Sequence, residues 1–491
     1  MFNTFKNKYH HVFILCVALL FSFFTLLTCS CVTSFIYPGI SCFSYYNDGS
    51  MFYLLGSNMV KGYTPYIDIF DHKGLYIFYY TAIGGLLGRT GVFFVQMILL
   101  TFGFFFIYKS VELFTKKGAI ISIGLCLFAA IYAFTGQTPN DSDLELPFNV
   151  LMIYFYLRAL KNNSHKDFLK ANVFCGISAG IALNLRVSDA LLPFAFVVFF
   201  LVYSIIHKEY KRLFINAGIV VMMMALMSVP PFFHAYLGGF MNDMVESVYL
   251  SNFKYITTTG DRYGGSPIIA YILVPTILVI FFLLIWFKRK QYNRDFILYF
   301  AFTSTVSLLI ELVIAFYPHY FIVLYPYLAI TLAVLLIPYL EKEEGMSKAY
   351  KPVVLGFAIL LSLSYVFNPV LYSVNKSVDE ANIAYINKNI NEEGKNGHTL
   401  IFAESALYIA TDIKIGYGDF SCQSNHVMFS SRYSRTALVN YLDSNESSYV
   451  VTNEAEKKFV LSLFNDLKSS SYQEVPIQQN SSLTIYRRIS L

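Results

Sequence analysis

Long apolar runs, separated by short polar connections, dominate the chain from His11 to Tyr372. A helix needs about 20 predominantly apolar residues to cross a bilayer, so runs near this length predict membrane-spanning helices. The candidate spans are Val12–Ile36, Val92–Tyr108, Ala119–Phe134, Leu146–Leu160, Ala171–Leu185, Ala190–Ile206, Leu213–Val229, Pro267–Phe287, Phe296–Phe316, Phe321–Leu340 and Pro352–Tyr372. The pattern predicts an all-α polytopic membrane domain over residues 1–372, with about 11 transmembrane helices.

The first outer loop, residues 37–90, contains two shorter apolar patterns. Met51, Phe52, Leu55 and Met59 share one face of a predicted helix that begins near Asp48, which indicates an amphipathic helix lying along the outer membrane surface. The run 75–87 is shorter than the roughly 17 residues that a span requires. We therefore expect interfacial helices in this loop, with 75–87 interfacial or re-entrant.

The pattern changes from Ser373 to that of a soluble domain. Segments 378–391 and 454–468 are predicted to be helical, and the short runs at 399–402, 449–452 and 483–486 are predicted to be strands. We expect a small α/β domain over residues 373–491.

Composition and charge set the orientation. The chain is 56% hydrophobic and 14% charged, which excludes a soluble globular protein. Lysine and arginine concentrate in alternate connections, at 6–8, 109–117, 158–170, 208–212, 288–294 and 342–351. By the positive-inside rule these connections are cytoplasmic, provided that 75–87 does not cross. The N-terminus of this multi-pass plasma (inner) membrane protein is then cytoplasmic, and its C-terminal domain is extracytoplasmic.

The first outer loop also carries an unusual concentration of ionisable residues, at Asp48, Asp68, Asp71, His72 and Lys73. Carboxylates at a membrane rim can act as a general base or hold a divalent cation, and a lysine beside them can pair with a lipid phosphate. The alternative is that the three aspartates only cap helices. If these residues form an active site, the aspartates are expected to be catalytic, and His72 and Lys73 are expected to contact the substrate.

Further candidates for substrate binding lie on the same predicted side. Asp143 and Glu145 precede the helix at 146, where acidic residues can also serve merely to complement the helix dipole. Arg186 ends another span and could meet an anionic headgroup or pair with Asp189. His319 and Tyr320 stand at a late outer rim, where a lone histidine is more often structural.

The sequence contains no phosphate loop, dinucleotide fingerprint, zinc-ligand spacing or nucleophile elbow. The lack of a nucleotide cradle fits a donor that is a lipid-linked sugar held in the membrane. No nucleic-acid partner is expected, and a divalent cation is the only cofactor that these residues suggest.

The arrangement resembles the GT-C superfamily of integral-membrane glycosyltransferases, in the bacterial branch similar to aminoarabinose transferases and protein O-mannosyltransferases. The resemblance rests on Asn47-Asp48 after the first helix, on the string from Gly62 to Gly74, on the acidic loop 138–147 and on His319-Tyr320. The chain departs from the family pattern at Gly49, where a second acid is usual, and at Gly74-Leu75, where Pro-Pro often follows the lysine.

The resemblance implies an inverting transfer from a polyprenyl-phosphate sugar to a lipid or glycan acceptor of the cell envelope. It implies that Asp48 is the base or positions the acceptor, and that Asp68, Asp71 and Lys73 hold the donor phosphate or the acceptor. Two other functions remain open. A transporter or flippase for lipid-linked glycans should carry charged residues near the bilayer midplane, and a non-catalytic envelope assembly factor should tolerate neutral replacement of the loop acids.

The charge pattern makes a topology prediction. A reporter fused after Leu491, or inserted within 135–145, should be active only when it reports an extracytoplasmic position. Fusions in intact cells, normalised for protein level, measure this. Cytoplasmic activity at Leu491 would mean that 75–87 crosses the membrane or that another span is miscounted.

Overall fold

The computed structural model describes residues 2–29, 48–116, 118–135, 140–252, 279–280, 282–283, 285–287, 289–314, 323–340, 380–403, 405–418, 432–444, 447–477 and 481–490. His319, Tyr320 and most of the predicted span Pro267–Phe287 lie outside these residues, as does the whole span Pro352–Tyr372. The predicted domain boundary at 372/373 lies outside them too. The side chain of Asp48 is likewise not described.

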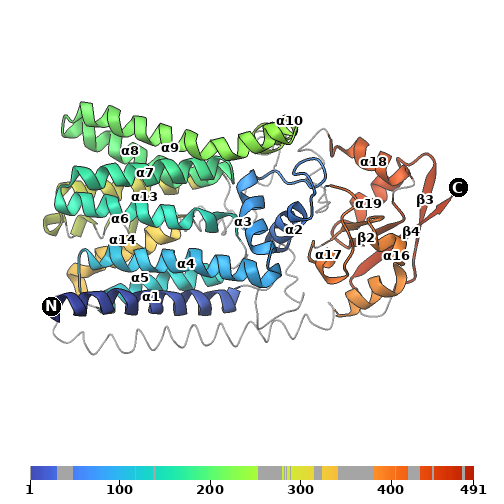
Figure 1. Cartoon of the computed structure of the whole chain (residues 1–491), viewed down its shortest axis with the longest axis horizontal. Helices are drawn as coiled ribbons and strands as arrows, with labels where there is room; N and C mark the ends of the chain where they lie inside the picture. The colour runs from blue at the N-terminus through green and yellow to red at the C-terminus, as the bar shows by residue number, and fades with distance from the viewer. Residues whose placement is uncertain are drawn as a thin grey trace.

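Long helices form a bundle in which they run side by side (Figure 1). They are α1 (Phe2–Cys29), α4 (Gly88–Glu112), α5 (Gly118–Thr135), α6 (Leu146–Asn162), α7 (His165–Leu183), α8 (Leu191–Ile206), α9 (Tyr210–Leu237), α13 (Arg294–Ile314) and α14 (Tyr325–Leu340). A core of buried aliphatic and aromatic side chains holds the bundle together, with Phe104, Tyr156 and Phe196 fully buried within it.

Three helices in the described part of the chain are long and apolar enough to cross a membrane: Gly88–Glu112, Val187–Ile206 and Tyr210–Leu237. His10–Leu26, Ile120–Ala129 and Tyr325–Ile337 are shorter apolar helices. The structure is therefore mostly helical, with several helices able to span a bilayer, as predicted. The total of about 11 spans stays a prediction.

Two short helices, α2 (Asp48–Val60) and α3 (Leu75–Gly85), lie at the end of the bundle opposite the N-terminus (Figure 1). At 1.5 Å per residue, the 11 residues of α3 extend about 16 Å, roughly half of the hydrocarbon core. On the predicted polar side of α2, Ser50 and Ser57 are buried along with Phe52 and Leu55, whereas Tyr53 is half-buried and Lys61, just beyond the helix, is exposed. Both sides of α2 therefore pack against other parts of the chain, and its position at a membrane surface stays a prediction.

The C-terminal unit (residues 380–490) is a four-stranded mixed sheet with short helices. The strands are β1 (Thr399–Phe402), β2 (Tyr449–Asn453), β3 (Ser470–Glu474) and β4 (Leu483–Ser490), in the order β1-β2-β4-β3. The β1–β2 pair is parallel, and the other two pairs are antiparallel. Helices α16 (Glu392–Lys395), α17 (Ala406–Ala410), α18 (Arg435–Asp443) and α19 (Lys457–Phe464) accompany the sheet.

The predicted strands at 399–402, 449–452 and 483–486 are confirmed, whereas β3 was not predicted. Its sequence, Ser-Ser-Tyr-Gln-Glu, lacks the apolar alternation that marks a half-buried strand, and it lies at the edge of the sheet. Its partner β4 supplies the backbone hydrogen bonds that make it a strand.

The close contact between α2 and α3 makes a stability prediction. A Cβ added at Gly56 would lie 2.3 Å from the backbone of Thr81 and Ala82, whereas one at Gly218 in α9 would meet nothing within 4 Å. Gly56→Ala must therefore separate the two helices, at a cost of about 1–3 kcal/mol typical of overpacking. Gly218→Ala should be neutral or slightly stabilising. Thermal unfolding of the two purified variants measures the difference, and equal melting temperatures would contradict the described packing.

Candidate functional site

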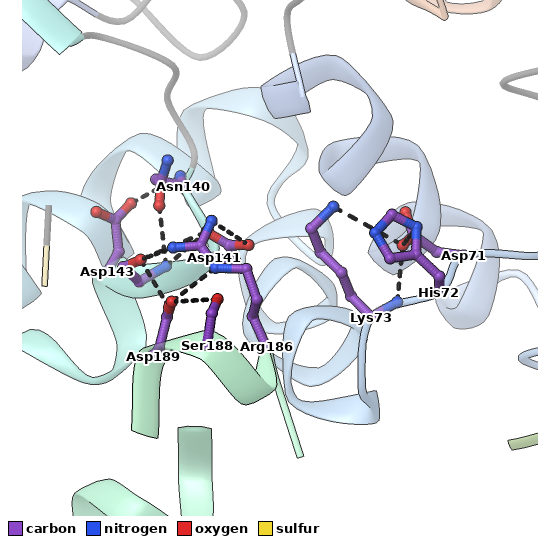
Figure 2. A network of polar contacts seen from close by, with 10 residues as sticks. Asp71, His72, Lys73, Asn140, Asp141, Asp143, Arg186, Ser188 and Asp189 are labelled. Atoms are coloured by element: carbon purple, nitrogen blue, oxygen red, sulfur yellow. Dashed lines mark hydrogen bonds and ion pairs between the residues drawn. The ribbon is translucent and has the colours of Figure 1, made fainter. Parts of the chain in front are cut away.

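Asp71, His72 and Lys73 form a buried charged group just before α3 (Figure 2). Asp71 is 0% exposed and Lys73 is 7% exposed. Asp71 Oδ1 accepts the backbone N–H of Lys73 at 2.9 Å and lies 3.9 Å from Lys73 Nζ and 3.5 Å from His72 Nδ1. Lys73 Nζ also stands 4.8 Å above the ring of Phe52. The group combines a buried cation with a carboxylate that orients its backbone.

Asp68 is not part of this group. It is exposed, and its Oδ2 accepts the backbone N–H of Thr64 at 2.7 Å, which closes the turn after Gly62. The turn also holds Tyr66 at a φ of 64°, and its hydroxyl donates to the Lys73 carbonyl at 2.8 Å. The structure thus places Asp68 in a local turn, where it neither caps a helix nor lies beside Asp71.

Gly74 brings this group against the end of α7. Its N–H donates to the Leu185 carbonyl at 2.8 Å, and the Tyr76 N–H donates to the Asn184 carbonyl at 3.2 Å. A Cβ at Gly74 would lie 2.0 Å from the Asn184 oxygen, so no larger residue fits here without a shift. A proline at position 74 would collide with the Asn184 carbonyl and would lack the N–H that bonds to Leu185. This contact explains why Gly74-Leu75 stands here in place of Pro-Pro.

Arg186 is the residue after Leu185, and all three nitrogens of its guanidinium group contact partners. Its Nε pairs with Asp189 Oδ1 at 2.6 Å, its Nη1 pairs with Asp141 Oδ2 at 3.2 Å, and its Nη2 donates to Ser142 Oγ at 2.9 Å. Ser142 Oγ in turn donates to Asp189 Oδ2 at 2.9 Å. Figure 2 shows this network beside the Lys73 group. Of the two uses foreseen for Arg186, pairing with Asp189 is the one the structure shows.

Asp143 joins four segments of the chain. Its two oxygens accept hydrogen bonds from the Tyr132 and Tyr80 hydroxyls, from Gln96 Nε2 at 2.8 Å and from the Asn140 N–H at 2.9 Å. It is 1% exposed, and burial raises its pKa to about 6, opposed by these hydrogen bonds. With its acceptor positions filled by protein donors, Asp143 holds η1 (Asp141–Leu144) against α3, α4 and α5. Its geometry favours a structural role over substrate contact.

Glu145 is the exception among these acids. It is 0% exposed and its side chain makes no hydrogen bond of ordinary geometry within the described residues, although Asn149 lies close enough to lower its pKa. Burial raises the pKa of Glu145 well above its usual range; Asp189 raises it further, and Arg186 lowers it. Glu145 therefore borders the Arg186 network as an acid that favours its neutral form.

The site contains more acidic than basic groups. Asp71, Asp141 and Asp189 are buried and meet Lys73 and Arg186. Within the described ranges, no three His, Cys, Asp or Glu side chains lie together in a way that could hold a metal ion.

Sequence reasoning missed several members of this network. Asp141 belongs to the same acidic loop as Asp143 and Glu145, but it was not among the candidate site residues. Ser142, Tyr80, Gln96 and Tyr132 carried no local signal, because their partners come from other helices. A polar residue in an otherwise apolar stretch, such as Gln96 in α4, is the one hint that the sequence offered.

Comparisons with known proteins agree with the predicted resemblance. A family model described as dolichyl-phosphate-mannose-protein mannosyltransferase matches residues 74–232, a segment that begins at Gly74 and includes η1 and Arg186. Among solved structures, the chain resembles the aminoarabinose transferase ArnT from Cupriavidus metallidurans in the apo state, with a TM-score of 0.55 and 15% identity over 98% of each chain. No curated protein matches the chain. The chain is thus similar to GT-C membrane glycosyltransferases with lipid-linked donors, and at this identity the solved structure shows the shared fold.

The raised pKa of Glu145 predicts a pH effect on stability. The folded protein binds this proton more tightly than the unfolded chain, whose glutamate pKa is about 4.3. The stabilising contribution is therefore complete below that value and is lost as pH rises through the folded pKa. Glu145→Gln, which cannot ionise, should lose less stability than wild type between pH 5 and pH 9.

Thermal unfolding at both pH values measures this effect. Glu393→Gln, an exposed change on the C-terminal unit, is the matched control and should follow wild type. Parallel pH profiles for all three proteins would show that Glu145 is ionised in the folded protein.

Proposed function

We propose that the protein is a glycosyltransferase that moves a sugar from a polyprenyl-phosphate-linked donor to a lipid or glycan acceptor of the cell envelope, on the outer face of the plasma membrane. The N-terminus is cytoplasmic in this proposal, and the C-terminal unit is extracytoplasmic. Membrane lipids surround the bundle, and the donor's polyprenyl chain lies among them.

The observation that carries the proposal is the buried Lys73 group at the end of the bundle where α2 and α3 lie. Lys73 is only 7% exposed, and its Nζ lies 3.9 Å from Asp71 Oδ1 and 4.8 Å from the centre of the Phe52 ring. A lipid phosphate is an anion that suits an ammonium acting as a point charge. The family match over 74–232 begins immediately after this lysine.

The remaining roles follow from position. Asp71 orients Lys73 through its backbone and side chain, and His72 stands at the same group, 21% exposed along its side chain. Arg186 and Glu145 lie beside the Lys73 group. Arg186 contributes a positive electrostatic potential there, and the protonated carboxyl of Glu145 can donate a hydrogen bond to a substrate oxygen. Asp143 supports this part of the site. His319 and Tyr320 remain proposed substrate contacts.

In the proposed reaction, an acceptor hydroxyl or amine attacks the anomeric carbon of the donor sugar. The new bond forms as the bond from that carbon to the phosphate oxygen breaks, and polyprenyl phosphate leaves with the electron pair. Asp48 takes the acceptor proton. Attack opposite the leaving group inverts the anomeric configuration, and Lys73 stabilises the charge on the departing phosphate.

Asp48→Asn tests the base. Helix α2 begins at this residue, and asparagine caps helices about as well as aspartate. The variant should therefore fold and reach the membrane normally. Loss of the base should lower the transfer rate by at least about 100-fold, the low end for general base catalysis.

The measurement uses purified protein in lipid with candidate polyprenyl-phosphate sugars and follows both transfer and hydrolysis. Asp412→Asn is the matched control, because it removes the same charge at an exposed position of the C-terminal unit with a φ of 51°, which asparagine tolerates. Near-wild-type turnover in Asp48→Asn would reduce Asp48 to a helix cap and leave Asp71 as the candidate base.

A further inference from the structure

Phe70, the residue immediately before Asp71, is buried in the core of the C-terminal unit. It is 0% exposed and belongs to a cluster with Leu400, Phe402 and Tyr433. Its ring centroid lies 4.9 Å from that of Tyr433. A residue of the first outer loop is thus part of the hydrophobic core of a unit that is more than 300 residues away in sequence.

Backbone contacts hold the same segment. The Phe70 N–H donates to the Gly418 carbonyl at 2.8 Å, and the Tyr433 hydroxyl donates to the Ile67 carbonyl. A Cβ at Gly418 would lie 2.1 Å from the Tyr433 oxygen, so this corner is closely packed. The C-terminal unit therefore packs against the Phe70 side chain and forms hydrogen bonds with the backbone of Ile67 and Phe70.

The consequence concerns Asp71 and Lys73. Asp71 is the next residue after Phe70 and is itself 0% exposed, and its Oδ1 accepts the backbone N–H of Lys73. Beyond Lys73, Gly74 is held by Leu185. The segment 70–74 is thus anchored to the C-terminal unit at one end and to the bundle at the other, with the charged group between the two anchors.

Two further contacts flank this segment. Ser50 of α2 and Ser405, which precedes α17, share a hydrogen bond at 2.8 Å between their hydroxyls, and both are buried. Arg432 pairs with Asp243 of α10 (Met241–Val245) at 2.9 Å. Both partners of this ion pair are partly exposed, so it contributes little by itself. Figure 1 shows the C-terminal unit beside α2 at this end of the bundle.

We propose that Phe70 is a positioning residue and that the C-terminal unit, through Phe70 and Tyr433, places Asp71 and Lys73 for the donor phosphate. The C-terminal unit is then part of the site through these positioning contacts. The expected effect of Phe70 on sugar transfer rests on the proposed function, whereas the expectation that the C-terminal unit holds this loop in place does not.

The first test compares tyrosines that each lose one hydroxyl. Tyr433→Phe removes the bond to the loop, and Tyr472→Phe removes bonds to Leu442 and Ser447 inside the C-terminal unit. Because one hydrogen bond changes an opening equilibrium by about 5-fold, amide exchange in residues 63–74 should quicken by about that factor in Tyr433→Phe. Tyr472→Phe should leave exchange in this loop unchanged while lowering the melting temperature of the C-terminal unit.

The second test uses Phe70→Leu and Phe70→Ala. A displacement of about 1 Å can cost up to about 100-fold in rate, so Phe70→Ala should raise the KM for the donor and lower kcat/KM by about 10- to 100-fold. Phe70→Leu, which still fills most of the pocket, should recover most of this loss. A purely structural role would lower the amount of folded protein while leaving the KM of the folded fraction unchanged.

The two readouts separate the two claims. Unchanged exchange in residues 63–74 of both Tyr433→Phe and Phe70→Ala would overturn the inference, whatever the activity. If wild type transfers sugar from no donor, the proposed function fails, and the exchange measurement alone decides whether the C-terminal unit positions the loop.

Discussion

The site depends on the contact of Gly74 with the backbone of Asn184 and Leu185. It joins the segment before α3 to the end of α7, two segments that are more than 100 residues apart. There is no room for a side chain at Gly74, so the two backbones lie directly against each other. Through this contact the Lys73 group comes beside the Arg186 network. Without it, the molecule would have two unrelated polar clusters.

Burial gives the charges around this contact different roles. Arg186 is shared among Asp141, Asp189 and Ser142, and Asp143 is satisfied by four donors from its surroundings. These groups stiffen the end of the bundle, because breaking a buried, paired network is costly. Glu145 and Lys73 are the other buried ionisable groups at this end of the bundle, and the proposed function assigns both of them to the substrate.

Much of the fold was readable from the sequence because periodicity is a local signal. Within the described residues, the long apolar runs correspond to helices of the bundle, and β1, β2 and β4 formed where short, mainly apolar runs stood. Strand β3 was not readable, since only pairing with β4 makes it a strand. The burial of Ser50 on α2 was not readable for a related reason, because Ser405 covers it from a unit that no local pattern connects to it.

The candidate site was predicted in part. The sequence pointed to Asp71, Lys73 and Arg186 because ionisable residues stand out in an apolar chain, but it could not separate Asp68, which closes a turn, from Asp71, which is buried. Nor could it show that Phe70 packs in the C-terminal core, since an apolar residue in a loop carries no indication of its partner.

The central claim is that Lys73 meets the lipid phosphate of the donor. Its most direct test is to titrate purified wild type, Lys73→Arg and Lys73→Ala with polyprenyl phosphate that carries no sugar. We expect saturable binding that is weakened by at least about 10-fold in Lys73→Ala and largely kept in Lys73→Arg, because arginine retains the charge. Equal affinity for all three proteins would contradict the claim.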